Sequence, residues 1–171
     1  MNSEALRRQQ APFKDRYRER PEDAKVTLTA EGRLGDLLTC KVQTGKALVE
    51  AGLHPATGGD GLTACSGDML LESLVACAGV TLRAVATSLG IEVRTGTIRA
   101  DGTLDVRGTL GVAKDVAVGF QTIRLSFDLD TDASPEQLET LTRLTERYCV
   151  VYQTLRHPPP IELSFAAVPQ P

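Results

Sequence analysis

Two cysteines in separate helical patterns are the residues of this sequence best suited to chemistry. Cys77 lies in the apolar segment DMLLESLVACAGVTLRAVATSLG, and Cys149 lies near the end of SPEQLETLTRLTERYCVVYQTL. A thiol can ionise to a strong nucleophile, be oxidised, or cross-link to a second thiol. If the two helices pack together, the pair predicts redox chemistry. If they do not, both cysteines are packing residues.

The local surroundings of each thiol leave both interpretations open. Helical spacing places Ser73 and Thr81 on the face of Cys77, which is either a packing seam of small residues or a reactive face. Arg147 lies two residues before Cys149, where an inward-pointing cation would favour the thiolate. If that arginine points to solvent, Cys149 is an ordinary core residue.

Other residues with suitable side chains are weaker candidates. Cys65 lies in a glycine-rich loop at residues 52–67 and is a rival second thiol, whereas Cys40 lies in a strand pattern and is expected in the core. His54 and His157 have no metal-ligand spacing with any cysteine. We therefore expect no metal and no cofactor.

The composition indicates one globular domain of ordinary size. The chain has 171 residues, of which 42% are hydrophobic and 24% charged, and a net charge of −3. This acidic balance lacks the electrostatic footprint of nucleic-acid binding. The N-terminal sequence has no export segment, and polar residues interrupt the longest apolar stretch, at 69–89. We expect a cytoplasmic protein without a membrane span, in which the cysteines form no static disulfides.

The elements that must position the two cysteines are helices within an α+β fold with a mostly antiparallel sheet. A charged helix is predicted at residues 4–20. The helix of Cys77 should run from about residue 67 to Gly90, with Ser66 as its N-cap. The helix of Cys149 should begin at a capping box that Ser134 opens.

Strands are predicted on either side of the long helix. Two turns organise them: residues 31–36 between the first two strands, and Asp101-Gly102 in a later hairpin. The predicted strands are 24–30, 37–44, 92–100, 102–110, 116–130 and 161–166.

Both cysteine segments resemble the two signatures of the OsmC/Ohr family, the osmotically inducible and organic hydroperoxide resistance proteins. The first signature, L-x-x-S/A-L-x-x-C-x-x-x-T-L, is matched around Cys77 by LLESLVACAGVTLR. The second, C-P-V-x-x-T-L before a proline-bearing turn and a strand, is similar to CVVYQTLRHPPPIEL at Cys149. The resemblance extends from about Val26 to Phe165. We therefore expect an N-terminal charged helical extension at residues 1–24 and an OsmC-like domain at residues 25–171.

The resemblance implies an architecture and an activity. The sheet would wrap around two long helices in an intertwined homodimer, with reactive sites at the subunit interface. The activity would be thiol-dependent reduction of hydroperoxides, preferably organic ones, in oxidative stress defence. Cys77 would attack the O–O bond, Cys149 would resolve the sulfenic acid as a disulfide, and a dithiol would reduce that disulfide. The alternative is a non-catalytic binding or stress-associated domain on the same fold.

Two positions depart from the family pattern. Hydroperoxide-resistance members pair an arginine with a glutamate that lies about ten residues before the first cysteine. Here that position is Gly67, and Asp68 is the nearest carboxylate, while Arg33 is the candidate arginine. Val150 replaces the usual proline after the second cysteine, which would allow the helix to continue through Cys149.

Overall fold

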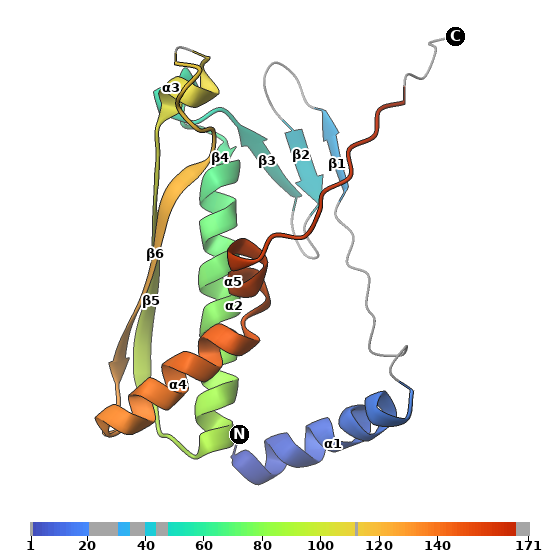
Figure 1. Cartoon of the computed structure of the whole chain (residues 1–171), viewed down its shortest axis with the longest axis vertical. Helices are drawn as coiled ribbons and strands as arrows, with labels where there is room; N and C mark the ends of the chain where they lie inside the picture. Colours follow the sequence, from blue (N-terminus) through green and yellow to red (C-terminus); the bar gives the residue numbers. More distant parts are fainter. Residues whose placement is uncertain (1, 21–30, 35–39, 44–47, 112, 167–171) are drawn as a thin grey trace.

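One long helix, α2 (Ser66–Leu89), forms the centre of the molecule, with a two-stranded ribbon along one side and two shorter helices across it (Figure 1). The computed structural model describes residues 2–20, 31–34, 40–43, 48–111 and 113–166. For residues 31–34 and 40–43, and for Gln9, Phe13, Asp15, Tyr17 and Arg18, it describes the backbone alone.

The described elements confirm an α+β fold whose strand pairs are mostly antiparallel. Besides α2, the helices are α1 (Ser3–Glu19), the 3-10 helix η2 (Pro55–Thr57), α3 (Val106–Thr109), α4 (Pro135–Tyr148) and α5 (Val150–Arg156). The strands are β1 (Glu31–Leu34), β2 (Cys40–Gln43), β3 (Leu48–Gly52), β4 (Ala64–Cys65), β5 (Thr95–Leu104) and β6 (Phe120–Asp130). Strands β1 to β4 form one sheet in chain order, in which β3 and β4 pair in parallel, and β5 and β6 form a separate antiparallel ribbon.

The ends of the two long helices follow their local signals closely. Helix α2 ends as predicted at Gly90, whose left-handed backbone (φ 69°) lets its N–H bond back to Ala86. Its N-cap is Cys65 rather than Ser66, because Ser66 already has helical backbone. Helix α4 begins with the predicted capping box, in which Ser134 and Gln137 each bond the other's backbone N–H.

The predicted hairpin at Asp101-Gly102 is wrong, because β5 passes straight through this pair. Asp101 lies within the strand, opposite Arg124 of β6, and forms an ion pair with Arg99 at 2.8 Å. Gly102 does not form a turn; it leaves room for neighbouring side chains. A Cβ atom there would lie 2.5 Å from the ring of Phe120 on β6 and 3.2 Å from Leu71 on α2. The chain instead leaves β5 for α3, and β5 pairs with β6 over its whole length.

Two further strand predictions are also corrected. Residues 31–34, predicted within a turn, form strand β1 and pair with β2, while the predicted strand at 24–30 lies outside the described residues. Residues 161–166 are predicted to form a closing strand but pair with no strand among the described residues. The last predicted strand before α4 begins at Phe120 rather than at residue 116.

The core lies at the carboxyl end of α2, where this helix meets α4 and the ribbon. Its buried members are Leu82, Val85, Ala86, Ile91, Val93 and Leu141, and partly buried side chains such as Phe127 and Leu129 pack against them. Burial of such side chains stabilises the fold by roughly 1.5–3 kcal/mol each. This end of the molecule therefore fixes how α4 crosses α2.

Within the described residues, α2 is the one helix whose length and apolar composition would allow it to cross a membrane, with a mean hydropathy of 1.6 over the relevant window. A central helix that packs inside a folded domain meets the same two conditions. Here α2 contacts β5, α4 and α5.

Candidate active site at the cysteine pair

Cys77 lies midway along α2, half-buried on the side that α5 covers. Of the two hydroxyl residues predicted to share its face, Thr81 lies near enough to the Cys77 sulfur to help lower its pKa. The Ser73 hydroxyl instead donates to the carbonyl of Leu70 on its own helix, at 2.7 Å. The polar surroundings of Cys77 on α2 therefore come from Thr81.

Cys149 occupies a break between α4 and α5. Its extended backbone (φ −73°, ψ 108°) ends one helix and starts the next, so the expected continuous helix is wrong. A side chain compensates for the helix hydrogen bond lost at this break. The Gln153 side chain donates to the Glu146 carbonyl, which the end of α4 leaves without a helical partner, at 2.7 Å. The Cys149 side chain is 1% exposed.

The structure brings the two thiols together. The Cys149 thiol and the backbone N–H groups of Val151 and Val150 lie near enough to the Cys77 sulfur to stabilise its thiolate and so to lower its pKa. Both cysteines are free thiols in this structure. Val150 departs from the family pattern, which has proline at this position. Its backbone N–H nevertheless helps to lower the pKa of Cys77.

These contacts make the two thiols chemically unequal. Burial opposes ionisation of Cys77, but the donors at Val151, Cys149, Val150 and Thr81 together outweigh it, so the pKa of the Cys77 thiol is lowered. Burial raises the pKa of the Cys149 thiol, and its neighbour Cys77 raises it further, while the backbone N–H groups of Tyr152 and, less strongly, Val151 oppose the rise. The arrangement therefore favours a thiolate at Cys77 and a protonated thiol at Cys149.

The arginine that the sequence offered for Cys149 points elsewhere. The Arg147 guanidinium lies over the ring of Tyr148, 5.7 Å from its centroid, and both side chains are exposed. Cys149 is thus a buried thiol whose pKa is raised, not a cation-activated nucleophile.

The structure does not bring Asp68 to the thiols. Asp68 is exposed in the first turn of α2, where it lines a shallow groove beside β5 with Glu72 and Val75. Nine helical residues separate it from Cys77, which corresponds to about 180° around the helix and about 13 Å along it. Arg33 lies in β1 opposite Lys41, and its side chain lies outside the described part of the chain.

The other thiols are placed apart from the pair. Cys65 precedes α2, beside Gly67 and Phe120, and twelve helical residues before Cys77 correspond to about 18 Å. Cys40 lies in β2, and its side chain is not described. Among the described residues no group of three His, Cys, Asp or Glu side chains is placed to hold a metal ion.

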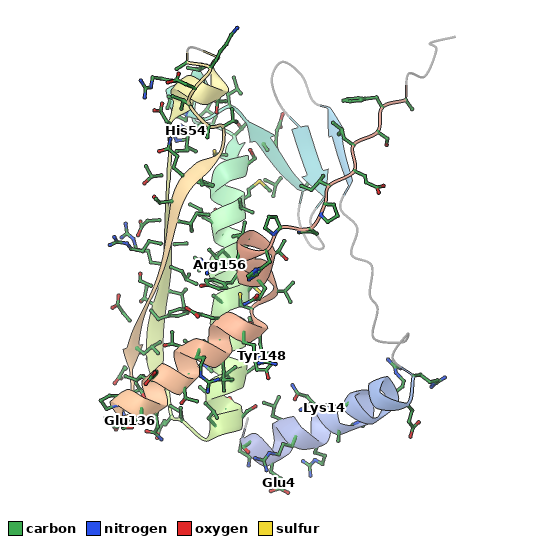
Figure 2. All side chains as sticks on the ribbon, viewed as in Figure 1. Glu4, Lys14, His54, Glu136, Tyr148 and Arg156 are labelled. Atoms are coloured by element: carbon green, nitrogen blue, oxygen red, sulfur yellow. The ribbon has the colours of Figure 1, made fainter. Side chains whose placement is uncertain are left out.

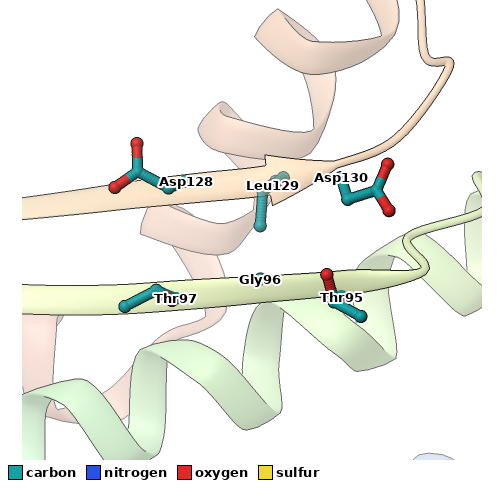
Figure 3. Close-up of a pocket in the computed structure, with 6 residues that line it drawn as sticks. All are labelled: Thr95, Gly96, Thr97, Asp128, Leu129 and Asp130. Carbon is teal, nitrogen blue, oxygen red and sulfur yellow. The ribbon is translucent and has the colours of Figure 1, made fainter.

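Two hollows adjoin Cys149, while a third lies on the ribbon. An open groove of about 500 Å³ is lined by Tyr148, Cys149 and His157, and a larger cavity of about 760 Å³ lies between Cys149 and β6. Figure 3 shows the pocket on the ribbon, lined by residues 95–97 and 128–130 and without a cysteine. Its Asp130 is already paired with Arg94, at 2.5 Å. The chemistry of the molecule therefore concentrates at α2, α4 and α5.

Sequence reasoning missed the N–H groups of Val150 and Val151 and the larger cavity. The helix break at Cys149 contains neither glycine nor proline. The local sequence therefore does not predict that the N–H groups of Val150 and Val151 lack helical partners there. The cavity depends on how β6 crosses the helices, which no single segment encodes.

Comparison with known proteins identifies the family and the fold of the chain. A family model described as OsmC-like protein matches residues 58–164. No curated protein matches the sequence. The fold is similar to that of an OsmC-like protein from Mycoplasma pneumoniae (TM-score 0.65, 15% identity, covering 78% of this chain and 90% of that chain).

Two structures of hydroperoxide resistance proteins have the same fold. One is from Elizabethkingia anophelis (TM-score 0.63, 16% identity, covering 78% of this chain and 91% of that chain). The other is OhrB of Bacillus subtilis (TM-score 0.54, 19% identity, covering 78% of this chain and 93% of that chain). With both cysteine segments inside the matched region, the chain belongs to the OsmC-like protein family.

Proposed function

We propose that this protein is a thiol peroxidase that reduces organic hydroperoxides with the Cys77–Cys149 pair. The single observation that carries the proposal is the proximity of the two thiols, which act on each other's pKa in opposite directions. Membership of the OsmC-like family and the fold shared with organic hydroperoxide resistance proteins support the same activity.

The proposed cycle has three balanced steps. The Cys77 thiolate attacks the O–O bond of ROOH, takes one oxygen to become a sulfenic acid, and releases ROH after protonation. The Cys149 thiol then condenses with the sulfenic acid, which forms the disulfide and releases water. A dithiol reductant next gives two electrons and two protons, which restores both thiols and leaves the reductant as a disulfide. A cytoplasmic location would supply such dithiols.

The environment supports the assigned order of the two cysteines. Cys77 is the better nucleophile because its pKa is lowered and its thiolate is already surrounded by hydrogen-bond donors. Cys149 suits the second step because its pKa is raised, which leaves it protonated and beside Cys77 until a sulfenic acid forms. Arg33 and Asp68 remain proposals as a pair that would hold the Cys77 thiolate. Asp68 lies on the opposite side of α2 from Cys77, so it could not play this part toward Cys77 of its own chain in the arrangement described.

We propose a homodimer on the basis of the apolar side chains that one chain leaves uncovered. On α2, Val80 is 74% exposed. In the C-terminal segment, which pairs with no strand that the structure describes, Ile161, Leu163 and Phe165 alternate with other residues and are 79–90% exposed. Alternation suits a strand with one buried face, and a second copy would provide a sheet edge to which this segment could pair.

The direct test is disulfide formation on oxidation. The fully reduced chain would be treated with one equivalent of cumene hydroperoxide, alkylated, and mapped by mass spectrometry without reduction. We expect a Cys77–Cys149 disulfide, loss of peroxide consumption in Cys77→Ser, and an accumulated sulfenic acid in Cys149→Ser. The matched control is Cys65→Ser, which should consume peroxide normally. Persistently reduced Cys77 and Cys149 with no peroxide turnover would reject the proposal.

A further inference from the structure

Of the two sulfurs of the pair, that of Cys149 is the one that the neighbouring hollows reach. Cys149 lines both the open groove of about 500 Å³ and the larger cavity of about 760 Å³, whereas Cys77 lines neither of them. The described lining of the groove comes from the end of α4, from α5 and from the segment after it, without a residue of α2. Figure 2 shows Tyr148 of this lining on the side of α4 that faces away from the β5–β6 ribbon. The groove thus leads to Cys149 without passing over α2, the helix that carries Cys77.

This position matters for cleavage of a disulfide. A thiolate attacks one sulfur of the bond in line, from the side opposite the sulfur that leaves. For attack at Cys149, that side is the one away from α2, where the groove lies. For attack at Cys77, the thiolate would have to approach from the side of α2 itself. The groove therefore gives access in the direction that cleavage at Cys149 requires.

The cover over Cys149 in the groove is thin. Cys149 is 1% exposed with both thiols reduced, but its neighbours in the groove, Tyr148 and Val150, are 59% and 70% exposed. Exposed side chains change rotamer rapidly. These two can therefore turn aside and uncover the sulfur without unpacking the core.

The charges of the groove suit an attacking thiolate. Arg147 and His157 line it, and its described lining contains no carboxylate. Arg147 is exposed over the ring of Tyr148 and makes no ion pair with the described residues. The larger cavity differs, because Glu146 lines it. A negatively charged nucleophile is therefore favoured in the groove.

The two sulfurs also differ as leaving groups. In thiol–disulfide exchange, the sulfur of the more acidic thiol leaves faster. The pKa of Cys77 is lowered by its neighbours and that of Cys149 is raised by burial and by Cys77. Cleavage that releases Cys77 and keeps Cys149 in the mixed disulfide is therefore the faster of the two. The direction agrees with the approach through the groove.

We infer that the dithiol reductant enters through the open groove and attacks the sulfur of Cys149, so that Cys77 is released first. The inference rests on the proposed function, because its substrate is the Cys77–Cys149 disulfide. One thiolate of the reductant bonds to the Cys149 sulfur as the bond to Cys77 breaks, and Cys77 leaves as a thiolate. The second thiol then attacks the reductant's own sulfur, which closes the reductant's disulfide and returns Cys149 as a thiol. The reductant gives two electrons, and its two protons pass to Cys149 and to solvent.

The experiment starts from the full-length chain oxidised with diamide, which forms the disulfide without peroxide. Mass spectrometry first verifies the Cys77–Cys149 bond. The oxidised chain is then mixed with a few equivalents of 2-mercaptoethanol, a monothiol that cannot complete the second step, and quenched within seconds with N-ethylmaleimide. We expect the mercaptoethanol adduct on Cys149 and the maleimide on Cys77. Failure to form the disulfide would reject the proposed function and the inference with it, whereas the position of the adduct tests the inference alone.

Substitutions then locate the route of entry. Thr154→Trp fills the groove from the exposed side of α5, and Thr142→Trp fills the larger cavity from the exposed side of α4. We expect Thr154→Trp to slow reduction of the disulfide by dithiothreitol at least tenfold and Thr142→Trp to leave the rate within twofold. Arg147→Gln should slow it about threefold at low ionic strength, because an exposed charge attracts a thiolate only weakly. Arg143→Gln, an exposed arginine of α4 outside the groove, is the matched control and should leave the rate unchanged.

Three results would overturn the inference. The first is a mercaptoethanol adduct on Cys77 with the maleimide on Cys149, since the reductant would then attack the other sulfur. The second is slower reduction in Thr142→Trp but not in Thr154→Trp, which would place the entry in the larger cavity. The third is equal slowing in both variants while each keeps the circular dichroism spectrum of the parent chain, because neither hollow would then be a specific route.

Discussion

The Cys149 thiol lies beside the Cys77 sulfur where α5 packs against α2. Together with the backbone N–H groups of Val151 and Val150, it lowers the pKa of Cys77, because nearby donors stabilise the thiolate. Burial raises the pKa of Cys149, and Cys77 raises it further, because ionisation would place a second negative charge beside the Cys77 thiolate. The surroundings of the pair thus make the two thiols unequal.

The first prediction concerns the pH dependence of Cys77 alkylation. In Cys149→Ala the donor thiol is lost, so the pKa of Cys77 should rise and its alkylation by iodoacetamide should begin at higher pH than in the parent chain. Mass spectrometry of the Cys77 peptide across a pH series measures the midpoint. Cys65→Ala is the control and should leave the midpoint in place. An unchanged midpoint in Cys149→Ala would show that the thiols do not interact.

The second prediction concerns Val150→Pro, which restores the residue usual in the family. Proline suits the first position of a helix, and the extended backbone of Cys149 (ψ 108°) is the conformation favoured before proline. The melting temperature should therefore change little. The pKa of Cys77 should rise, because proline removes one of its backbone N–H donors. Unfolding of the variant would mean that the break at Cys149 is misplaced.

The third prediction concerns the close approach at Gly102. Gly102→Ala places a methyl group 2.5 Å from the Phe120 ring, and overpacking of this kind costs about 1–3 kcal/mol of unfolding free energy. Urea denaturation measures the loss. Adding Phe120→Leu should recover part of it, since the two changes act on one contact. Simple additivity of the two losses would contradict the packing described here.

The fourth prediction concerns the unpartnered hydroxyl of Thr145. Thr145→Val removes a buried polar atom at nearly constant volume, so the ligand-free chain should gain about 1 kcal/mol of unfolding free energy. Thermal and urea denaturation measure the change. Thr142→Val, on the exposed side of α4, should alter the unfolding free energy by less than about 0.5 kcal/mol. A destabilised Thr145→Val would show that the hydroxyl has a partner.

The fifth prediction concerns the C-terminal segment and the proposed dimer. Leu163→Asp places a charge among the apolar residues that a second copy would cover, so the dimer should dissociate to monomers. Light scattering after size-exclusion chromatography measures the mass. Glu162→Gln, on the alternate face of the segment, should remain dimeric. A parent chain that elutes as a monomer at micromolar concentration would reject the dimer itself.

The parts of the fold that the sequence predicts well are those with strong local signals. Helix α4 begins at its capping box and α2 ends at Gly90, because the residues that satisfy the helix ends are neighbours in the chain. Asp101-Gly102 misleads because its glycine is required by a side chain on another strand. A residue pair typical of turns can therefore lie within a strand when its glycine is needed for packing against a distant residue.

The candidate site divides in the same way. The resemblance to the OsmC/Ohr family identifies both cysteines, and helix periodicity places Thr81 beside Cys77. The inequality of the thiols is not predictable from either segment, because it depends on backbone N–H groups that one segment offers to a sulfur on another. Asp68 fails as a neighbour of Cys77 because helical rotation turns it to the opposite side.

The placement of the two cysteines far apart in sequence has a mechanical consequence. A disulfide between them would close a loop of about 70 residues that includes the whole β5–β6 ribbon. Loops of this length lower the entropy of the unfolded chain by an amount worth roughly 4 kcal/mol. In the proposed cycle the chain would alternate between a tethered and an untethered form. The oxidised form would then unfold less readily than the reduced form, so the stability of the chain would follow the balance of oxidant and reductant around it.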